Sequence, residues 1–380
     1  GSAAHSATYY LGCSGTPVAT PCTNKTAAPC DTLENLLDHM TAPGDIGEVE
    51  GNCPIYRNSL AATTHAAGTA GAHMTLRWDG VGTPPSFTQS TLLGGWTVHA
   101  GDIYKATPGF TVQEWGLTQN NLREDTINGQ WDRQSFDVTN AANCPSTTIL
   151  SFDHAWCQIG GIVYLRSTGG DPDTRYTTPG VEVVNAAVTN NQVLRLEHQY
   201  WDVTGSPTNN HLANADGMIF YLGQGIVLDV NAPRVTVAGV TIRDGIRVQG
   251  RMLRWYNDLG QPDMTGLVLR DFRIHRCGRD CLDLAGGVNF DGAALGDSVH
   301  IHHGEIAYTF DHGNINPTLA IGGTASTNVG TRRNILVEYV EEHDMCESIA
   351  FNSTQAIDTG VRGSMTIRHG YIHDGVNGLT

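Results

Sequence analysis

Apolar and polar residues recur in a repeating pattern over the C-terminal part of the chain. Five segments can be laid over one another, and their first residues are Val237, Leu269, Ile301, Val337 and Ile367. These starts are separated by 32, 32, 36 and 30 residues. Such a period is typical of repeat folds, in which each unit buries its apolar face against its neighbours. The pattern therefore predicts a stack of similar rungs.

Within each segment, apolar residues favour the first, fourth and sixth places, as in Leu269, Phe272 and Ile274. The fourth and sixth places alternate as in a β-strand, so we expect the fifth and seventh to point outward. Glu342 breaks the rule at a sixth place, which indicates either a bulge or a register that is off by one. Because no segment carries the apolar stripe of a helical repeat, the sequence predicts an all-β fold, a right-handed parallel β-helix (β-solenoid).

A short amphipathic helix is predicted ahead of the strands. Asp31-Thr32 supply an N-cap before Leu36, Leu37 and Met40, and Pro43-Gly44 stop the helix. An open end of a β-helix exposes apolar side chains and unpaired backbone to water, so we expect this helix to cap the stack.

Two regions follow from this pattern. We expect residues 1–44 to form an N-terminal segment with the capping helix, and residues 45–380 to form one parallel β-helix domain. Its rungs are predicted to be irregular up to about residue 233, with strands such as Gly161 to Leu165, and regular over 234–380.

Charge and hydropathy exclude two kinds of partner. The chain has 22 Lys+Arg against 38 Asp+Glu, a formal charge of −16, which opposes binding to nucleic acid. No stretch approaches the ~18 apolar residues that a membrane span requires, so no membrane partner is expected.

Cysteine usage indicates an oxidising, extracellular setting. The nine cysteines lack the paired spacing of a zinc site, and disulfides are the better interpretation. Local bridges would join Cys22 to Cys30, Cys144 to Cys157 and Cys277 to Cys281, although spacing alone does not fix the connectivity. The odd count leaves at least one cysteine unpaired within the chain, with its partner expected beyond Thr380.

Several strings resemble secreted right-handed β-helix proteins of bacteria that act on polysaccharides. GTAGAHMTLRWDG and GGWTVHAGDIYKA are similar to the entry region of those proteins, and GGIVYLRSTGGDPDT and IRHGYIHDG extend the likeness over most of the chain. The resemblance implies a β-helix that is a glycoside hydrolase, a polysaccharide lyase or a non-catalytic member of the group.

Two shorter strings resemble particular enzymes of this group. GRDCLDL is similar to the Asp-Asp-Cys element of polygalacturonase-type hydrolases, which nominates Asp280, although Arg279 replaces the first aspartate. MTIRHG resembles alginate and chondroitin lyases, whose base is a lysine. The two lysines of this chain, Lys25 and Lys105, both precede the repeats.

The register brings an acidic cluster together. Residues at one place of successive rungs lie about 4.8 Å apart. Ten or eleven places after the anchors come Asp280, Asp311, His312 and Glu347. Glycoside hydrolysis needs two carboxyl groups, about 5 Å apart for retention or roughly 6.5–9.5 Å for inversion. Alternatively, the three acids would suit calcium, or they simply bond their own backbone in turns.

The outward face of the rungs is a second candidate site for substrate binding. Its fifth and seventh places carry Arg273, His275, His343, Tyr371 and His373, groups suited to an elimination on a uronic sugar. The alternative is a solvated face.

The bend after each anchor adds two arginines to this surface. Arg270 and Arg368 would grip a glycan, or they would pair with Asp271 and Glu338 in a structural ladder.

Together these observations predict an extracellular protein that cleaves glycosidic bonds of a polysaccharide, with hydrolysis by paired carboxylates as the leading mechanism. One alternative is a polysaccharide lyase, which would use calcium if it uses any cofactor. Another is a non-catalytic adhesive or structural solenoid that associates end to end. No motif identifies the sugar, the linkage or the oligomeric state.

Overall fold

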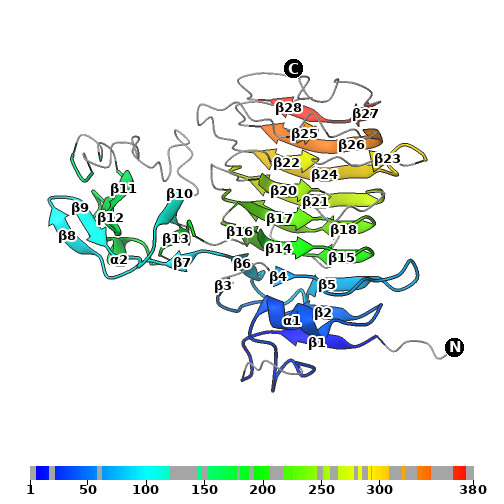
Figure 1. Ribbon diagram of the computed structural model, residues 1–380, viewed down its shortest axis with the longest axis horizontal. Coiled ribbons are helices and arrows are strands. Elements are labelled where there is room, and N and C mark those ends of the chain that lie inside the picture. Colours follow the sequence, from blue (N-terminus) through cyan, green and yellow to red (C-terminus); the bar gives the residue numbers. More distant parts are fainter. Residues whose placement is uncertain are drawn as a thin grey trace.

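The computed structural model is a stack of parallel strands with a smaller lobe at its side (Figure 1). The structure describes residues 6–16, 22–57, 62–119, 144–147, 150, 153–177, 180–187, 192–205, 217–223, 225–245, 251–256, 264–277, 281–284, 290–291, 293–307, 319–321, 332–343 and 363–373. Only the backbone is described for 113–119, 251, 290–291, 319–321, 332–333 and 363–364.

Strands on three faces surround one apolar interior, and neighbours on each face pair in parallel. The first face holds β1 (Thr8–Leu11), β2 (Ile46–Val49), β5 (Met74–Trp78), β15 (Trp201–Thr204), β18 (Val235–Ala238) and β27 (Gly363–Arg368). The second face holds β3 (Tyr56–Arg57), β6 (Ser86–Thr88), β16 (Met218–Tyr221), β19 (Val240–Arg243) and β28 (Tyr371–His373).

Longer strands run across both of these faces, and a separate sheet forms the third face. The strands that run across the first and second faces are β21 (Leu267–His275), β24 (Val299–Ala307) and β26 (Arg332–His343), and the short β23 (Phe290–Asp291) pairs with the start of β26. The third face holds β4 (Ala62–Thr63), β14 (Gln192–Leu196), β17 (Ile226–Val230), β20 (Arg251–Trp255), β22 (Leu282–Leu284) and β25 (Leu319–Ile321). The chain is a parallel β-helix, as the repeat predicted.

The predicted register is confirmed through all five segments. Their first residues pair in sequence order, Val237 with Leu269, then Ile301, Val337 and Ile367. The third residue of each segment has a left-handed backbone, with φ of +63° at Gly239 and +53° at Asp271, His303, Tyr339 and His369. This bend turns the chain from the first face to the second.

Glu342 is in register at the sixth place of the segment that starts at Val337. It pairs with Ile306 in one direction and Ile372 in the other, and it is 2% exposed. Both expected explanations, a bulge at this place and a shifted register, are therefore wrong. A carboxylate is accommodated where the other rungs carry isoleucine.

The capping helix is present as α1 (Leu33–His39). Thr32 is its N-cap, and the Thr32 hydroxyl accepts a hydrogen bond of 3.1 Å from the backbone N–H of Asn35. Leu33, Leu36 and Leu37 are fully buried in the same core as the rung side chains. The helix lies at the N-terminal end of the stack (Figure 1), where it covers the interior.

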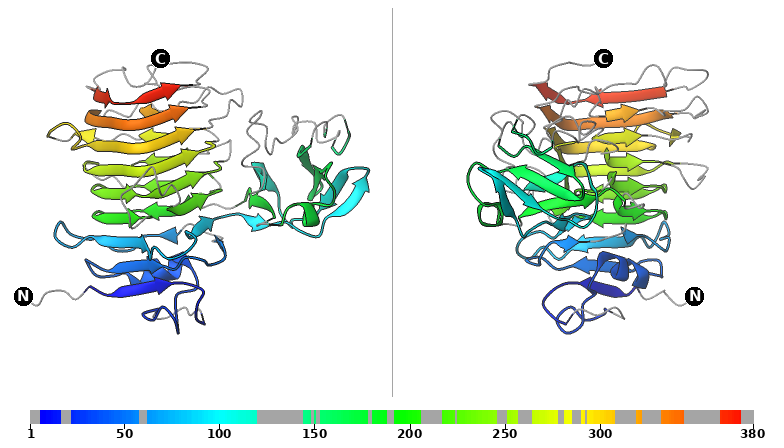
Figure 2. Two further views of the ribbon diagram at one scale, coloured as in Figure 1. Left: turned by 180° about the vertical axis from the view of Figure 1, so that it is seen from behind. Right: turned by 60° about the vertical axis from the view of Figure 1, so that its left-hand side comes forward.

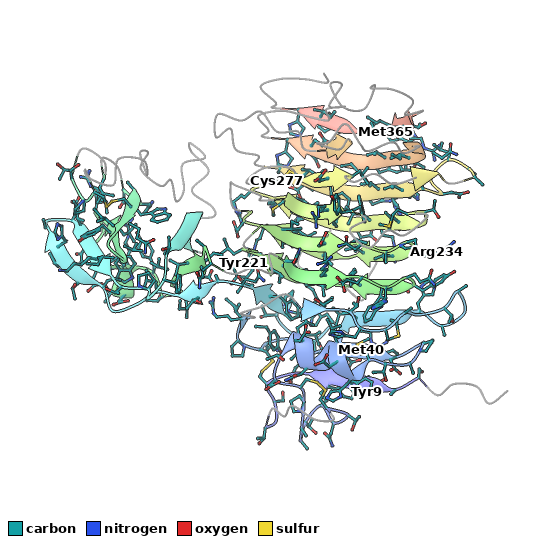
Figure 3. All side chains as sticks on the ribbon, viewed as in Figure 1. Tyr9, Met40, Tyr221, Arg234, Cys277 and Met365 are labelled. Carbon is teal, nitrogen blue, oxygen red and sulfur yellow. A yellow bond between two sulfur atoms is a disulfide. The ribbon has the colours of Figure 1, made fainter. Side chains whose placement is uncertain are left out.

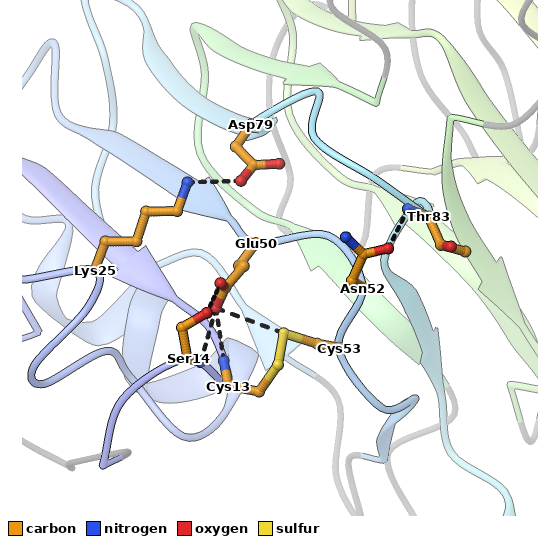
Figure 4. Close-up of a disulfide and its surroundings, with 8 residues drawn as sticks. All are labelled: Cys13, Ser14, Lys25, Glu50, Asn52, Cys53, Asp79 and Thr83. Atoms are coloured by element: carbon orange, nitrogen blue, oxygen red, sulfur yellow. Dashed lines mark hydrogen bonds and ion pairs between the residues drawn. A yellow bond between two sulfur atoms is a disulfide. The ribbon is translucent and has the colours of Figure 1, made fainter.

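Four disulfides join described cysteines. Cys22–Cys30, Cys144–Cys157 and Cys277–Cys281 confirm the expected local pairs. Cys13–Cys53 was not among the expected pairs, and it joins cysteines 40 residues apart near the N-terminus (Figure 4). Cys346, the ninth cysteine, lies outside the described residues.

Glu50 holds this N-terminal disulfide to the first rungs. It accepts hydrogen bonds from the backbone N–H groups of Cys13 and Ser14, at 2.9 and 3.0 Å (Figure 4). Lys25 donates to Asp79 at 2.6 Å beside it.

No helix among the described residues is long and apolar enough to span a membrane.

An antiparallel lobe is inserted between β6 and β14 (Figure 2). Its elements are β7 (Thr91–Leu92), β8 (Thr97–Ala100), β9 (Ile103–Ala106), β10 (Val112–Gln119), β11 (Trp156–Ile159), β12 (Ile162–Arg166), α2 (Pro172–Arg175) and β13 (Val181–Asn185). It has apolar clusters of its own, one around Trp156 and one around Leu150. The run from Gly161 to Leu165, expected in an irregular rung, thus belongs to an antiparallel strand, because a short apolar run predicts a strand but not the direction in which it pairs.

A buried carboxylate attaches the lobe to the stack. Glu182 of β13 is fully buried, and its Oε1 lies 2.7 Å from the guanidinium of Arg57. The hydroxyls of Ser90 and Tyr221 donate to the same oxygen at 2.9 Å. Tyr221 lies on the side of the stack from which the lobe extends (Figure 3).

Candidate functional site

The candidate site lies on the second face, at the C-terminal rungs. Arg273, Glu305, Glu341 and Tyr371 are register partners at the fifth place of four successive rungs. The seventh places of the same rungs carry His275, Ala307, His343 and His373. The sequence-predicted neighbours Arg273, His275, His343, Tyr371 and His373 are therefore brought together.

Glu305 is the centre of this group. Arg273 Nε lies 2.9 Å from its Oε2, while His343 Nε2 and His275 Nε2 lie 3.0 and 3.3 Å from its Oε1. The two histidines belong to the rungs on either side, and the small Ala307 between them leaves room for both to reach Glu305. The close approach of His275, supported by His343 and Arg273, lowers the pKa of Glu305 to about 2 although partial burial opposes this.

Glu341, on the next rung, has a different environment. Its side chain is 46% exposed, and its Oε1 lies 3.1 Å from His373 Nε2. The rings of His343 and His373 stack with centroids 5.2 Å apart, which keeps both imidazoles beside the two carboxylates. One carboxylate is thus tightly held and the other is open to solvent.

A hollow of about 230 Å³ lies over these side chains. Its floor includes Phe272, whose ring occupies the space that a side chain at Gly304 would fill. Around the hollow lie Arg273, Glu305, Tyr339, Glu341, His369 and Tyr371. Tyr371 is 63% exposed, which is large for an aromatic side chain, so an apolar ring face borders the two carboxylates.

Stacked rings form one wall at the bends. Tyr339 lies between His303 and His369, with ring centroids 4.8 and 4.7 Å apart and planes inclined by 14° and 8°. The ladder of ion pairs predicted at the bends is also present, because Arg270 contacts Asp271 at 2.5 Å and Arg368 contacts Glu338 at 2.6 Å.

A histidine cluster adjoins this wall. His302 Nδ1 lies 2.7 Å from His303 Nδ1, and the rings of His300 and His302 are 4.1 Å apart. Burial, together with the neighbouring His300 and His303, lowers the pKa of His302 to about 4. A neutral His302 therefore accompanies the ion pairs at physiological pH.

The predicted acidic cluster falls outside the described residues. Asp280, Asp311, Glu347 and His312 all belong to segments that the structure leaves undescribed, and with them the possible calcium ligands. Their catalytic and metal-binding roles stay predictions.

Within the described part of the chain, three sets of side chains have spacing suited to a metal ion. Two of them contain the disulfide-bonded pairs Cys22–Cys30 and Cys13–Cys53, whose sulfurs are not available as thiolates. The third is Glu34, Asp38 and His65, which belongs to the N-terminal end of the stack rather than to the hollow.

Glu305 and Glu341 were not singled out as catalytic candidates from the sequence. Both appear at outward fifth places of the repeat, among residues interpreted as one polar face. The signal that distinguishes them is the pair of acids on consecutive rungs, flanked by histidines at the seventh place.

Comparison with known proteins finds loose similarities to solved structures. No family model and no curated protein sequence matches it. An alginate lyase from Paenibacillus sp. str. FPU-7 is 9% identical, with 98% of each chain covered and a TM-score of 0.39. Pectate lyase Pel9A is 10% identical over 98% of this chain and 76% of that chain, with a TM-score of 0.42.

A further solved structure, named a glycoside hydrolase, is 10% identical, covering 98% of this chain and 95% of that chain with a TM-score of 0.41. These names belong to the group that the sequence strings resemble. Superpositions this loose transfer no residue and no reaction to this chain, so the site stands on its own geometry.

Proposed function

We propose that the chain is an extracellular glycoside hydrolase that cleaves a polysaccharide at the hollow over Glu305 and Glu341. The observation that carries this proposal is the pair of carboxylates at one place of adjacent rungs, one held ionised and one exposed. Enzymes with two carboxyl groups assign different roles to them through such differences in environment.

The strand spacing favours a retaining mechanism. Adjacent strands lie about 4.8 Å apart, close to the ~5–5.5 Å that separates the two carboxyl groups of retaining enzymes. Glu305, ionised at any physiological pH, is suited to attack the anomeric carbon. Glu341 is open to the hollow and to water, as the acid and base must be.

The reaction then proceeds in two balanced steps. Glu305 forms an ester bond to the anomeric carbon while the glycosidic bond breaks and Glu341 donates its proton to the departing oxygen. Water next attacks the same carbon, Glu341 takes a proton from it, and the ester bond to Glu305 breaks. One water is consumed for each bond cleaved. His275, His343 and Arg273 keep Glu305 ionised and oriented, and His373 positions Glu341.

The test is to incubate the protein with a panel of polysaccharides and to follow reducing ends, unsaturated uronic products and the anomeric configuration of the first product. Glu305→Gln and Glu341→Gln should each reduce the release of reducing ends by about 10²–10⁴-fold. Glu48→Gln is the matched control, since Glu48 is also an outward carboxylate paired with an arginine, at 2.7 Å from Arg77.

The rival carboxylates and reactions give different results. Activity lost in Asp280→Asn, Asp311→Asn or Glu347→Gln, but kept in both glutamine variants of the hollow, would move the reaction to the predicted acidic cluster. Unsaturated products would establish a lyase, and calcium dependence would add the metal to it. A protein inert on every glycan, with or without calcium, would favour the non-catalytic solenoid.

Extracellular location is part of the proposal. Four disulfides among the described cysteines are typical of proteins that mature in an oxidising compartment. End-to-end association of the stack stays a prediction.

A further inference from the structure

We infer that the hollow binds an uncharged sugar, so that the substrate is a neutral glycan rather than a uronic one. This inference rests on the proposed function, because it assumes that the hollow over Glu305 and Glu341 is where the glycan binds. It follows from two features of the described side chains, the balance of charge around the hollow and the kind of aromatic surface that is exposed there.

Arg273, which lines the hollow, and the nearby Arg368 already have carboxylate partners. Arg273 lies 2.9 Å from Glu305. Arg368, which precedes the lining residue His369, lies 2.6 Å from Glu338. A guanidinium committed to a protein carboxylate is a poor partner for a second one, because the first must be displaced or must share its donors.

Glu341 then leaves an excess of negative charge. Among the side chains that line the hollow it is a second carboxylate beside Glu305, while Arg273, which lines the hollow too, is already paired with Glu305. Before Glu341 takes up the proton that it donates in the reaction, a sugar carboxylate entering here would meet it as a like charge, and like charges within a few ångströms repel in a partly desolvated site. Hydroxyl groups carry no such penalty.

The exposed aromatic surface fits a neutral ring. Tyr339 is 47% exposed, but His303 and His369 stack on its two sides, so its ring is less open to a ligand than that of Tyr371. Tyr371 is 63% exposed, and its ring makes a tilted contact with that of His373, with centroids 4.7 Å apart. It therefore offers an apolar face and a hydroxyl beside the carboxylates, a combination that suits the C–H face and hydroxyl rim of a sugar.

The experiment compares acidic glycans with their carboxyl-reduced forms. Polygalacturonate and alginate oligosaccharides, each beside the same oligosaccharide with its carboxylates reduced to primary alcohols, and neutral xylan and cellulose oligosaccharides are titrated into the protein at pH 8. Each pair keeps its linkage and loses only the charge. We expect a neutral oligosaccharide to bind at least about tenfold more tightly than any acidic one, with little dependence on salt.

A pair of variants tests the aromatic surface. Tyr371→Ala should weaken binding of the neutral oligosaccharide by about 3- to 10-fold. Tyr9→Ala is the matched control, since Tyr9 stacks on His39 at the opposite end of the stack. Equal binding by Tyr371→Ala and wild type would overturn the role of Tyr371.

Failure of this inference and failure of the proposed function are distinguishable. Tighter binding of an acidic oligosaccharide, weakened by salt, would overturn the inference even if that glycan is hydrolysed. Tight binding of a neutral oligosaccharide without hydrolysis would support the inference while the proposed reaction fails. Absence of binding by every oligosaccharide, neutral or acidic, would overturn the inference.

Discussion

Glu305 shows how single residues at this site depend on neighbours from other rungs. Its partners come from the rung before, Arg273 and His275, and from the rung after, His343. They hold its pKa at about 2, below the ordinary 4.5. The unfolded chain therefore takes up this proton first as the pH falls. The stabilisation that Glu305 provides is complete above about pH 4.5 and is lost as the pH approaches 2.

This gives a prediction on stability against pH. The free energy of unfolding, measured by urea titration, should fall more steeply between pH 4.5 and 2 for wild type than for Glu305→Gln. The two falls should differ by about 1–3 kcal/mol after allowance for solvent screening. Other acids titrate in the same range in both proteins, so their effect cancels in the comparison. Glu48→Gln should keep the wild-type slope, and parallel curves for wild type and Glu305→Gln would contradict the predicted network.

The sequence predicted which residues share this surface but not how they pair. Register alone brings Arg273, Glu305 and Glu341 into one column. That both His275 and His343 turn toward Glu305 depends on the small Ala307 between them and on side-chain directions that no repeat pattern contains. The predicted carboxylates Asp280, Asp311 and Glu347 follow the anchors by more places than the regular strands extend, so the register gives their positions less directly.

At the scale of elements, the close packing of neighbouring rungs gives a second prediction. A Cβ at Gly304 would lie 2.2 Å from the ring of Phe272, which is 3% exposed. Gly304→Ala should therefore force the ring to move and destabilise the protein by about 1–3 kcal/mol. Gly370 occupies the same fourth place two rungs later, where the nearest atom would be 3.5 Å away. Gly370→Ala is thus a matched control that should change the denaturation midpoint little.

If Gly304→Ala lowers the stability less than Gly370→Ala does, the packing of Phe272 against Gly304 is contradicted. Because Phe272 also lines the hollow, Gly304→Ala should weaken glycan binding as well, whereas a purely global loss of stability would leave binding by the folded protein unchanged.

Elements were predictable where one side of the strand is buried in a repeating way. Apolar residues recur at the places of Leu269, Phe272 and Ile274, and this was enough to give the register. The exceptions in the regular rungs are Gly304, Gly370 and Glu342. The left-handed bends carried no such signal, because Asp271, His303, Tyr339 and His369 stand where glycine would have marked them. Glu342 appeared to break the register only because a buried carboxylate is an unusual replacement for isoleucine.

At the scale of the whole molecule, the lobe could not be told from irregular rungs. Its strands β9, β12 and β13 are short runs rich in Ile, Val and Tyr, as rung strands are, but they pair in the antiparallel direction. Pairing direction depends on contacts between segments far apart in sequence, which a single sequence does not display. The side chains that attach the lobe, Arg57 and Glu182, are likewise 125 residues apart.

Attachment of the lobe gives the third prediction. Glu182 is fully buried, so removing its cation by Arg57→Met should leave a buried carboxylate with only hydroxyl donors and cost about 3 kcal/mol. The cost should concentrate at the junction, because β13 and β7 pair with each other and not with the rungs. Hydrogen exchange of amides in β13 should accelerate, while exchange in β17 and β20 stays slow.

Two variants decide whether the ion pair is responsible. Arg77→Met removes an arginine that is 44% exposed and bonds Glu48, so it should cost at most about 1 kcal/mol. Adding Glu182→Gln to Arg57→Met should recover much of the lost stability, since the buried charge is then gone as well. If Arg57→Met behaves like Arg77→Met, or if the second substitution recovers nothing, the apolar contacts around Tyr221 hold the lobe without the ion pair.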